Sequence, residues 1–234
     1  MATRPEFEYR NKNVRLNRIL TAVIIVMALC VVLFPVLVRA KSKLRDRSCA
    51  SNLRQIGMAL TLYASNYDGH FPIACDPSDR AVNGMWEDPK QAATVRKFPL
   101  LSNVLKPYVK SPEVFHCPLD NGGLILENRV GTEAPPPFVS SPSMFAEYGS
   151  SYLMRTDIVF MSMIKKGYWP NARTAVLFDA YGHWHADEEP LGPSMDFKRE
   201  IALAESYKYN VLFGDGHVGM VPFDELQALW ASRL

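Results

Sequence analysis

The sequence has little net charge and none of the short motifs that mark the common enzyme classes. Its 234 residues include 26 Lys and Arg against 24 Asp and Glu, a formal charge of +2 at pH 7. That balance is too near neutral to predict a nucleic-acid partner. There is no Gly-x-Ser-x-Gly nucleophile elbow, no glycine-rich phosphate loop and no dinucleotide fingerprint. We therefore expect a protein that is not an enzyme and does not bind nucleic acid.

Cysteine is also scarce, and its spacing excludes the usual structural zinc motifs. Of the four cysteines, Cys30 lies in an apolar stretch, which leaves Cys49, Cys75 and Cys117. None of them forms the Cys-x2-4-Cys pair that zinc fingers use. Three thiols allow one disulfide, and we expect Cys117 to pair with either Cys49 or Cys75 if this part of the chain faces an oxidising compartment.

What the sequence does have is a long apolar run, Ile19–Val38, with no charged residue. Its length of about 20 residues matches the hydrocarbon core of a bilayer, so the run predicts a transmembrane helix. Pro35 near its end would kink such a helix without stopping it. The alternative is a cleaved signal peptide, whose apolar region is only about 7–15 residues long and ends at a small-residue cleavage site. Basic residues flank the run on both sides, so their count does not set an orientation.

The apolar periodicity continues beyond this run. Leu53, Ile56, Leu60 and Tyr63 recur at steps of three and four, which places them on one face of a helix. We therefore expect one helix to serve as both anchor and spine. The predicted organisation is a basic tail at 1–18, a transmembrane helix at 19–38, an amphipathic continuation at 39–67 and a globular head at 68–234.

The clearest signal in the head is a β-hairpin at Tyr209–Phe223. Two apolar runs flank the turn residues Gly214, Asp215 and Gly216, and an Asp-Gly pair suits the positive φ angles of tight hairpins. The fold class we expect is α+β, with the long helix packed on a small antiparallel sheet. The other expected elements are strands at 150–155 and 174–179, helices at 98–109, 196–207 and 224–232, an extended run at 111–120 and a surface excursion at 121–143.

Three segments, in this order behind an apolar helix, resemble a known family: Ser48–Pro72, Tyr108–Asp120 and Asn210–Val221. They are similar to bacterial type IV pilin-like proteins related to the pseudopilins of type II secretion, with a prepilin-type amino terminus and a carboxy-terminal His-x9-Asp-Gly signature. The resemblance implies a pilin-like α+β fold, a cytoplasmic amino terminus, a single helix in the inner membrane and a head in the periplasm. It also implies other pilin-like subunits or secretion-machine components as partners, and self-association through the amino-terminal helix.

The sequence departs from that family at the processing site. The glycine before the family's cut is Asn13 here, the residue after it is Val14, and the family's glutamate is Arg18. An arginine would repel the amino terminus of a neighbouring subunit that a glutamate would attract. The signature histidine is replaced by Glu205, and only Asp215 and Gly216 of the signature remain. We therefore expect an assembly subunit or accessory that is not processed normally.

A metal-binding head is the alternative function. His183, His185 and Asp187 occupy alternate positions, which on an extended segment would face one side and could ligate zinc. They make the alternative a membrane-tethered metal-binding or hydrolytic domain. Asp215 beside His217 is a weaker candidate, because an aspartate in a turn usually serves the turn.

No cofactor is expected, but the resemblance also implies calcium, which related heads bind. Oxygen ligands are plentiful, although without the spacing of a contiguous calcium loop. The acidic candidates are Asp179, Asp187, Glu188, Glu189, Asp196 and Asp215.

Overall fold

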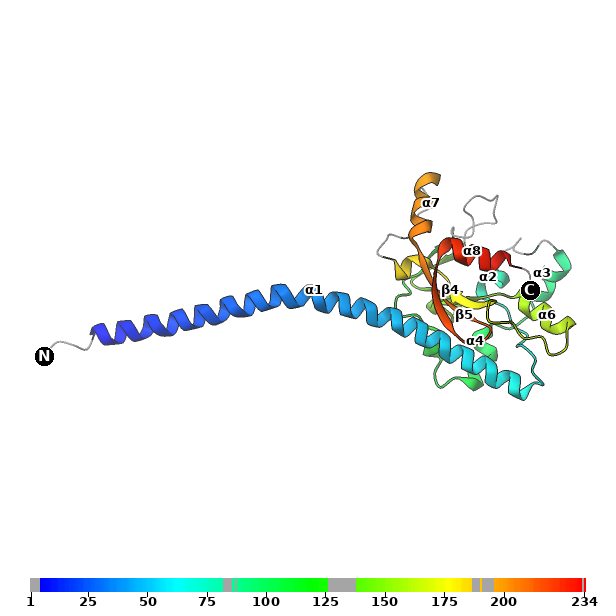
Figure 1. Ribbon diagram of the computed structural model, residues 1–234, viewed down its shortest axis with the longest axis horizontal. Helices are drawn as coiled ribbons and strands as arrows, with labels where there is room; N and C mark the ends of the chain where they lie inside the picture. The colour runs from blue at the N-terminus through cyan, green and yellow to red at the C-terminus, as the bar shows by residue number, and fades with distance from the viewer. Residues whose placement is uncertain are drawn as a thin grey trace. The chain divides into compact units, whose positions relative to one another are not determined.

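The computed structural model describes residues 5–81, 86, 88–125, 138–186, 190, 196–232 and 234. The chain divides into two compact units, Met1–Leu44 and Arg45–Leu234. Helix α1 is Pro5–Asn66, and its first residue is a proline, which helices accept at their start because no backbone donor is needed there (Figure 1). The helix ends in a turn in which Gly69, at a φ of +78°, donates its N–H to the Ala64 carbonyl at 2.8 Å.

The other elements of the second unit are short. In chain order they are α2 (Pro77–Ala81), α3 (Pro89–Val95), α4 (Leu101–Val104), η1 (Lys106–Tyr108), η2 (Pro112–Phe115), β1 (Gly123–Ile125), β2 (Phe138–Ser140), α5 (Met144–Tyr148), β3 (Tyr152–Met154), α6 (Asp157–Ile164), β4 (Ala175–Asp179), η4 (Gly182–His185), α7 (Phe197–Ser206), β5 (Lys208–Phe213), β6 (Val218–Pro222) and α8 (Phe223–Ala231).

Four of the strands form one antiparallel sheet in the order β3-β4-β5-β6. Strands β5 and β6 are a hairpin, and Gly216 in its turn has a φ of +89°, a conformation that favours glycine. Phe178 of β4 lies opposite Val211 of β5. A separate two-stranded sheet pairs β1 with β2. The second unit is therefore α+β, built on a four-stranded antiparallel sheet.

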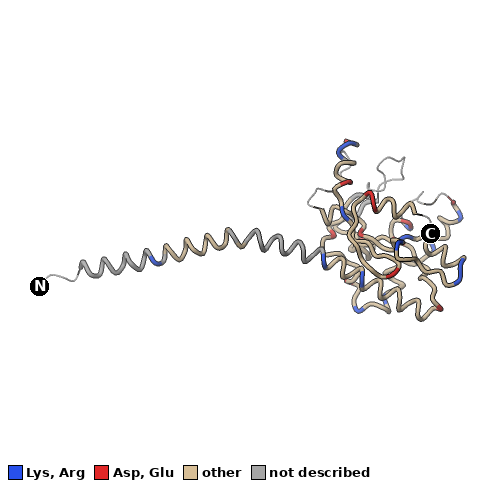
Figure 2. The backbone as a smooth tube through the Cα atoms, viewed as in Figure 1, with Lys and Arg blue, Asp and Glu red and all other residues tan. Residues whose placement is uncertain are grey.

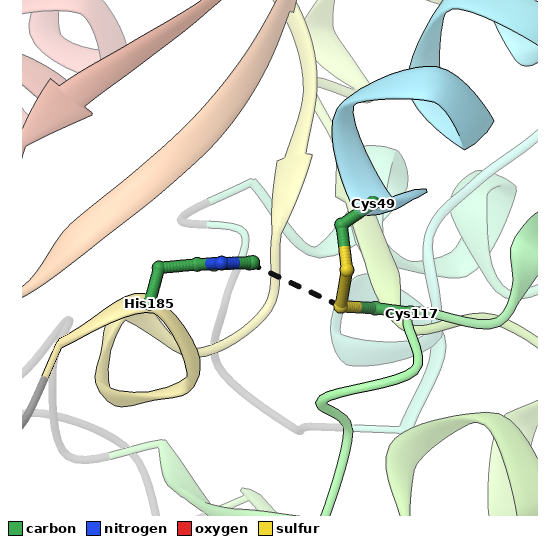
Figure 3. A group of neighbouring side chains, drawn as sticks. All are labelled: Cys49, Cys117 and His185. Atoms are coloured by element: carbon green, nitrogen blue, oxygen red, sulfur yellow. Dashed lines mark hydrogen bonds between the residues drawn. A yellow bond between two sulfur atoms is a disulfide. The ribbon is translucent and has the colours of Figure 1, made fainter. Parts of the chain in front are cut away.

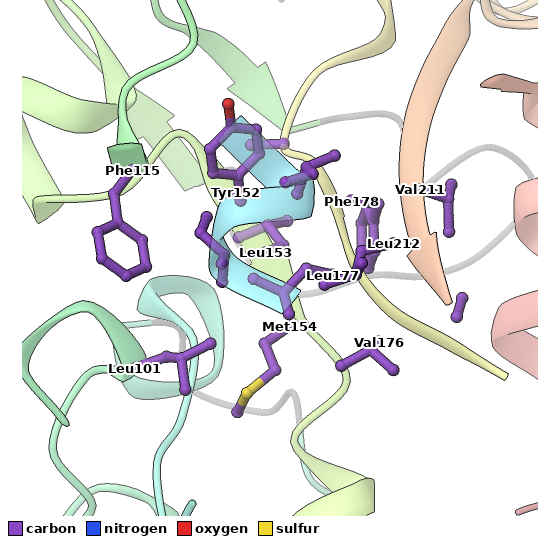
Figure 4. Close-up of a cluster of buried hydrophobic side chains, with 14 of the residues drawn as sticks. Leu101, Phe115, Tyr152, Leu153, Met154, Val176, Leu177, Phe178, Val211 and Leu212 are labelled. Atoms are coloured by element: carbon purple, nitrogen blue, oxygen red, sulfur yellow. The ribbon is translucent and has the colours of Figure 1, made fainter. Parts of the chain in front are cut away.

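One face of the carboxy-terminal part of α1 packs on that sheet. Figure 4 shows side chains of β3, β4 and β5 gathered around a turn of the helix. The approach is close, because a Cβ atom added at Gly57 would lie 3.0 Å from Cδ1 of Leu212 in β5. The buried apolar residues that α1 contributes to this core are Cys49, Leu53, Ile56, Ala59, Leu60 and Ala64.

The predicted transmembrane helix at Ile19–Val38 is wrong. Among the residues that the structure describes, no helix has an apolar stretch long enough to cross a membrane. A crossing needs about 20 consecutive apolar residues. This finding also overturns the pilin-like fold with a membrane anchor, the single-pass topology and the inner-membrane location.

Two shorter expectations also differ from the structure. The run at 111–120 contains the 3-10 helix η2, because Ser111 and Pro112 are helix-start residues and the Ser111 Oγ accepts the N–H of Glu113 at 3.2 Å. The helix expected at 98–109 is split into α4 and η1. Most of the expected excursion at 121–143 lies outside the described residues.

The packing of α1 on the sheet gives a first test by mutation. Leu53→Ala should lower the free energy of unfolding by about 2–5 kcal/mol, because Leu53 is fully buried and its removal leaves a cavity. Met58→Ala, on the exposed side of the same helix, should change it by less than about 0.5 kcal/mol. Urea unfolding of both variants measures the difference, and equal effects would show that α1 is not packed as described.

Candidate functional site

A buried polar cluster lies against a disulfide where α1 meets the sheet. The disulfide joins Cys49 of α1 to Cys117, which follows η2. Asp179 ends β4, His185 ends η4 and Asn210 lies within β5. We call Asp179, His185 and Asn210 the Asp-His cluster. Figure 3 shows the imidazole of His185 with its edge turned toward the sulfur of Cys117.

Three donors of the Asp-His cluster converge on one carboxylate oxygen. Oδ2 of Asp179 accepts the Asn210 N–H at 2.6 Å and the Asn210 Nδ2 at 2.9 Å. Nε2 of His185 lies 2.9 Å from the same oxygen. Nε2 also lies 3.1 Å from the Nδ2 of Asn210, so it donates to Asp179 when it carries the ring proton and accepts from Asn210 when the proton is on Nδ1. On its other side, Nε2 is 3.9 Å from Sγ of Cys117.

The sheet and one glycine explain how these groups meet. Antiparallel pairing of β4 with β5 brings Asp179 next to Asn210, although 31 residues separate them. The chain then turns back as η4, which lies against β5. A Cβ atom at Gly182 would lie only 2.5 Å from Cζ of Tyr209, so this position needs a residue without a side chain. Glycine there allows η4 to place His185 beside Asp179.

The cysteine segment is held by its own hydrogen bonds. The N–H of Cys117 donates to Ser151 Oγ at 3.0 Å, and that hydroxyl donates to Asp120 Oδ2 at 2.6 Å. Asn52 of α1 donates to the carbonyl of His116 at 2.8 Å, which ties the helix to the same segment. Both sulfurs of the disulfide therefore sit on backbone that is fixed independently of the S–S bond.

Burial limits what this site can do chemically. The side chains of Asp179 and His185 are fully buried, and Cys49 and Cys117 have no exposed surface. A substrate could not reach His185 in this conformation, so the arrangement does not suit acid-base catalysis on an external molecule. Its atoms do suit metal ligation. Within the described residues, the one group of three ligand-type side chains is Cys49, Cys117 and His185, whose ligand atoms all lie within 4.8 Å of one another.

The predicted His183, His185 and Asp187 triad is not assembled on one side. Gly182–His185 is a 3-10 helix rather than an extended segment, so residues two apart do not face the same way. Nε2 of His183 lies 3.3 Å from Oδ1 of Asn121, whereas His185 contacts Asp179. Asp187 lies outside the described residues, as do Glu188 and Glu189.

The remaining acidic candidates do not gather either. Asp215 is exposed in the hairpin turn, where its Oδ1 accepts the His217 N–H at 3.0 Å and lies 2.6 Å from the His217 Nδ1. Hydrogen bonds from His217 lower the pKa of the Asp215 carboxyl. Asp196 precedes α7 and Asp179 is buried in the cluster. None of the three belongs to a group of ligand-type side chains with two others that the structure describes.

The other candidate residues lie apart from this site. Asn13, Val14, Arg18 and Pro35 all fall within α1. Of the three thiols that were candidates for the disulfide, Cys75 is free and buried. The fourth cysteine, Cys30, is also free and is exposed.

A groove of about 700 Å³ lies beside the hairpin turn and has the size of a small-molecule site. It is lined by Thr61 and Ser65 of α1, by the 167–172 segment and by Asp215. Trp169 in that segment donates from Nε1 to the Gly214 carbonyl at 2.7 Å. Asp215 is the one ionisable side chain in the lining, so the groove offers no pair of groups for catalysis.

Sequence reasoning missed Asn210, and a signal for it was present. Asn210 interrupts an otherwise apolar strand, and a polar residue at a buried strand position needs a buried partner. The partner itself, Asp179, also ends an apolar strand. What the sequence could not supply was the pairing register that joins the two.

A pair of buried aspartates, Asp76 and Asp79, lies at the start of α2. Oδ1 of Asp76 accepts the N–H of Asp79 and the hydroxyl of Ser78, both at 2.8 Å, so Asp76 serves as a helix N-cap. Burial raises the pKa of Asp76 to about 6, and burial together with the charge of Asp76 raises that of Asp79. Burial also raises the pKa of the neighbouring Cys75 thiol to about 12, so this cysteine stays protonated and is not a nucleophile.

Asp179 and Asp215 each contact a histidine, Asp179 in a buried pair and Asp215 in an exposed one, so the same substitution can be compared at both positions. Asp179→Ala should lower the free energy of unfolding by about 3–5 kcal/mol, because it leaves two buried donors and the His185 imidazole without their acceptor. Asp215→Ala removes an exposed pair and should have only a small effect. Chemical unfolding at pH 7 distinguishes the two, and a small effect of Asp179→Ala would contradict the contacts of the Asp-His cluster.

The acidic pair at α2 predicts a pH dependence of stability. Because the folded-state pKa of Asp76 is raised from 3.8 to about 6, the folded chain binds this proton more tightly than the unfolded chain does. The resulting stabilisation is complete below about pH 4 and is lost as the pH rises through 6, a decrease of the order of 2 kcal/mol. Urea unfolding between pH 4 and 7.5 measures it.

Asp79→Asn should make that decrease smaller, because it removes one of the two buried carboxyls. Asp215→Asn should leave the decrease in place, since the lowered pKa of Asp215 contributes with the opposite sign. A slope that is the same in the wild type and in Asp79→Asn would show that the pair does not titrate in this range.

No protein-family model, curated protein or solved structure matches this chain. Its function has to be argued from its own residues and from the geometry just described.

Proposed function

We propose that this chain is a structural subunit or accessory of a pilin-like assembly, of the kind found in type II secretion and type IV pilus-like machines, and that it is not an enzyme. Two features support the proposal. The segments Ser48–Pro72, Tyr108–Asp120 and Asn210–Val221 resemble that family. The second unit has a buried polar site that is closed to substrates in this conformation, and the first unit has a helix with a large exposed apolar surface.

The exposed apolar surface of α1 in the first unit is the observation that carries the proposal. Val31 is 71% exposed and Ile24 is 66% exposed. Figure 2 shows this part of the helix as an uninterrupted uncharged stretch. Exposing this much apolar surface to water is unfavourable, with a free energy of about 25 cal/mol for each Å² exposed. The exposed large apolar residues are Leu20, Val23, Ile24, Ile25, Val26, Met27, Leu29, Val31 and Leu33.

The pattern around the helix indicates several neighbours rather than one. Ile24, Ile25, Val26 and Met27 are consecutive and all more than half exposed, and at about 100° per residue they surround the helix axis. A two-stranded coiled coil would need only one apolar stripe. A helix that is apolar on all sides is covered by a bundle, so copies of this helix packed together are the assembly we infer.

Arg18 shapes how such a bundle forms. In the family that the sequence resembles, a glutamate at this position pairs with the amino terminus of a neighbour. The arginine is exposed and carries the wrong charge for that pairing. Together with Asn13 at the cut site, it favours an unprocessed subunit whose association depends on apolar packing.

Cys30 allows this proposal to be tested on the full chain. It is exposed in the middle of the apolar stretch, whereas Cys75 is buried and the other two cysteines are bonded to each other. A short bismaleimide should therefore link neighbouring copies through Cys30 into covalent dimers, since packed helices lie about 8–10 Å apart. Sedimentation of the unlinked protein should show species larger than a dimer.

Charged variants give the control. Ile24→Glu and Met27→Glu should reduce both the covalent dimer and the large species, because they place carboxylates in the apolar contact. Ile164→Glu, at an exposed apolar position on α6, should leave both unchanged. A chain that remains monomeric at tens of micromolar and gives no Cys30 cross-link contradicts the proposal.

A further inference from the structure

We propose that reduction of the Cys49–Cys117 disulfide creates a zinc site, in which the two thiolates and Nε2 of His185 bind one Zn²⁺ ion. The inference concerns the second unit alone and does not depend on assembly through the apolar helix. It differs from the metal site expected at His183, His185 and Asp187, because it uses the cysteines and only one of those histidines.

The ligand atoms are already gathered within the span of one metal site. Sγ of Cys49, Sγ of Cys117 and Nε2 of His185 all lie within 4.8 Å of one another. Around zinc, with Zn–S distances of about 2.3 Å and a Zn–N distance of about 2.0 Å, ligand atoms are about 3.5–3.8 Å apart. Once the S–S bond is broken, rotation of the two cysteine side chains lets the sulfurs take up that spacing. Figure 3 shows that the three side chains point toward a common centre.

The backbone that carries the ligands is held without the disulfide. Cys49 lies in α1 at the start of the face that packs on the sheet, and Asn52 bonds the helix to the His116 carbonyl. The N–H of Cys117 is bonded to Ser151. His185 ends η4, which packs against β5. Reduction therefore frees two sulfur atoms without releasing the segments that hold them.

Asp179 adds a reason for a cation at this point. Its Oδ2 is 2.9 Å from the ligand nitrogen of His185. Its Oδ1 is buried and has no hydrogen-bond partner among the described residues. A buried carboxylate oxygen without a partner is unfavourable, and a divalent cation nearby would compensate for it. Because Oδ2 contacts the same nitrogen that would bind zinc, Asp179 would take part as the fourth ligand, in place of its contact with Nε2.

The chemistry balances with a dithiol as the reductant. A dithiol attacks the disulfide and donates two electrons, the S–S bond breaks to give two Cys thiols, and the dithiol becomes a disulfide. Zn²⁺ then replaces the two thiol protons, which pass to solvent. His185 binds through Nε2 in the tautomer whose proton is on Nδ1, the same tautomer in which Nε2 can accept from Asn210. The oxidation state of the metal does not change.

Cobalt binding to the full chain tests the site directly. The oxidised protein and protein reduced with dithiothreitol are freed of reagent under nitrogen and titrated with Co²⁺. The reduced protein should bind one equivalent, with the thiolate-to-metal charge-transfer and d–d bands of a tetrahedral site, and Zn²⁺ should displace it. The oxidised protein should bind none at this site. Circular dichroism of each sample reports whether the fold is kept.

Variants show which side chains bind. Cys117→Ser should abolish the charge-transfer bands, and Asp179→Asn should weaken Zn²⁺ binding by about 10–100-fold. His185→Ala should weaken it more than Asp179→Asn does. Cys75→Ser, Cys30→Ser and His217→Ala are matched controls, because these residues lie outside the ligand group, and they should bind like the wild type.

Three results would overturn the inference. One is a reduced, folded chain that binds no metal. Another is binding that does not change in His185→Ala, which would make the site a pair of thiolates alone. The third is a reduced chain that unfolds and does not regain its circular dichroism when Zn²⁺ is added.

Discussion

The packing of the carboxy-terminal part of α1 on the four-stranded sheet is the contact on which the rest of the second unit depends. Leu53 and Ile56 are fully buried in it, and Gly57 lets the helix approach Leu212 of the sheet. The strands are short, so without this helix one face of the sheet would be exposed to water. The helix supplies the apolar cover for that face.

The disulfide fixes one end of that helix face. Cys49 and Cys117 are 68 residues apart in the sequence, and closing a loop of this length removes conformational freedom from the unfolded chain worth about 4 kcal/mol. At the other end, the turn at Gly69 returns a hydrogen bond to Ala64. The chain segment between these two points contains the whole packed face, so the helix has little freedom to slide along the sheet.

Local patterns in the sequence predict the elements of this fold better than they predict its site. The hairpin follows from Asp215 and Gly216, whose turn preference is local, and α8 follows from its own apolar periodicity. The Asp-His cluster depends on β4 pairing with β5 in one register, which no spacing of residues in the sequence reveals. The alternating histidines wrongly predicted ligands on one side of an extended segment, for a similar reason. Whether Gly182–His185 is extended or a 3-10 helix depends on its packing against Tyr209. The predicted membrane helix rested on length and composition alone.

The position of the Asp-His cluster is determined by one carboxylate oxygen of β4, which contacts both β5 and η4. Oδ2 of Asp179 accepts from β5 and from η4 at once, and a shift of either element would leave buried donors unpaired. The same contact places His185 beside the disulfide that secures α1. Reduction of that disulfide would then expose the sulfurs to an imidazole already held in position, and not to solvent, because both cysteines and the imidazole are buried. The disulfide joins the Cys49 and Cys117 segments, and the metal would join the same two segments and η4, so the helix face could stay on the sheet in either state.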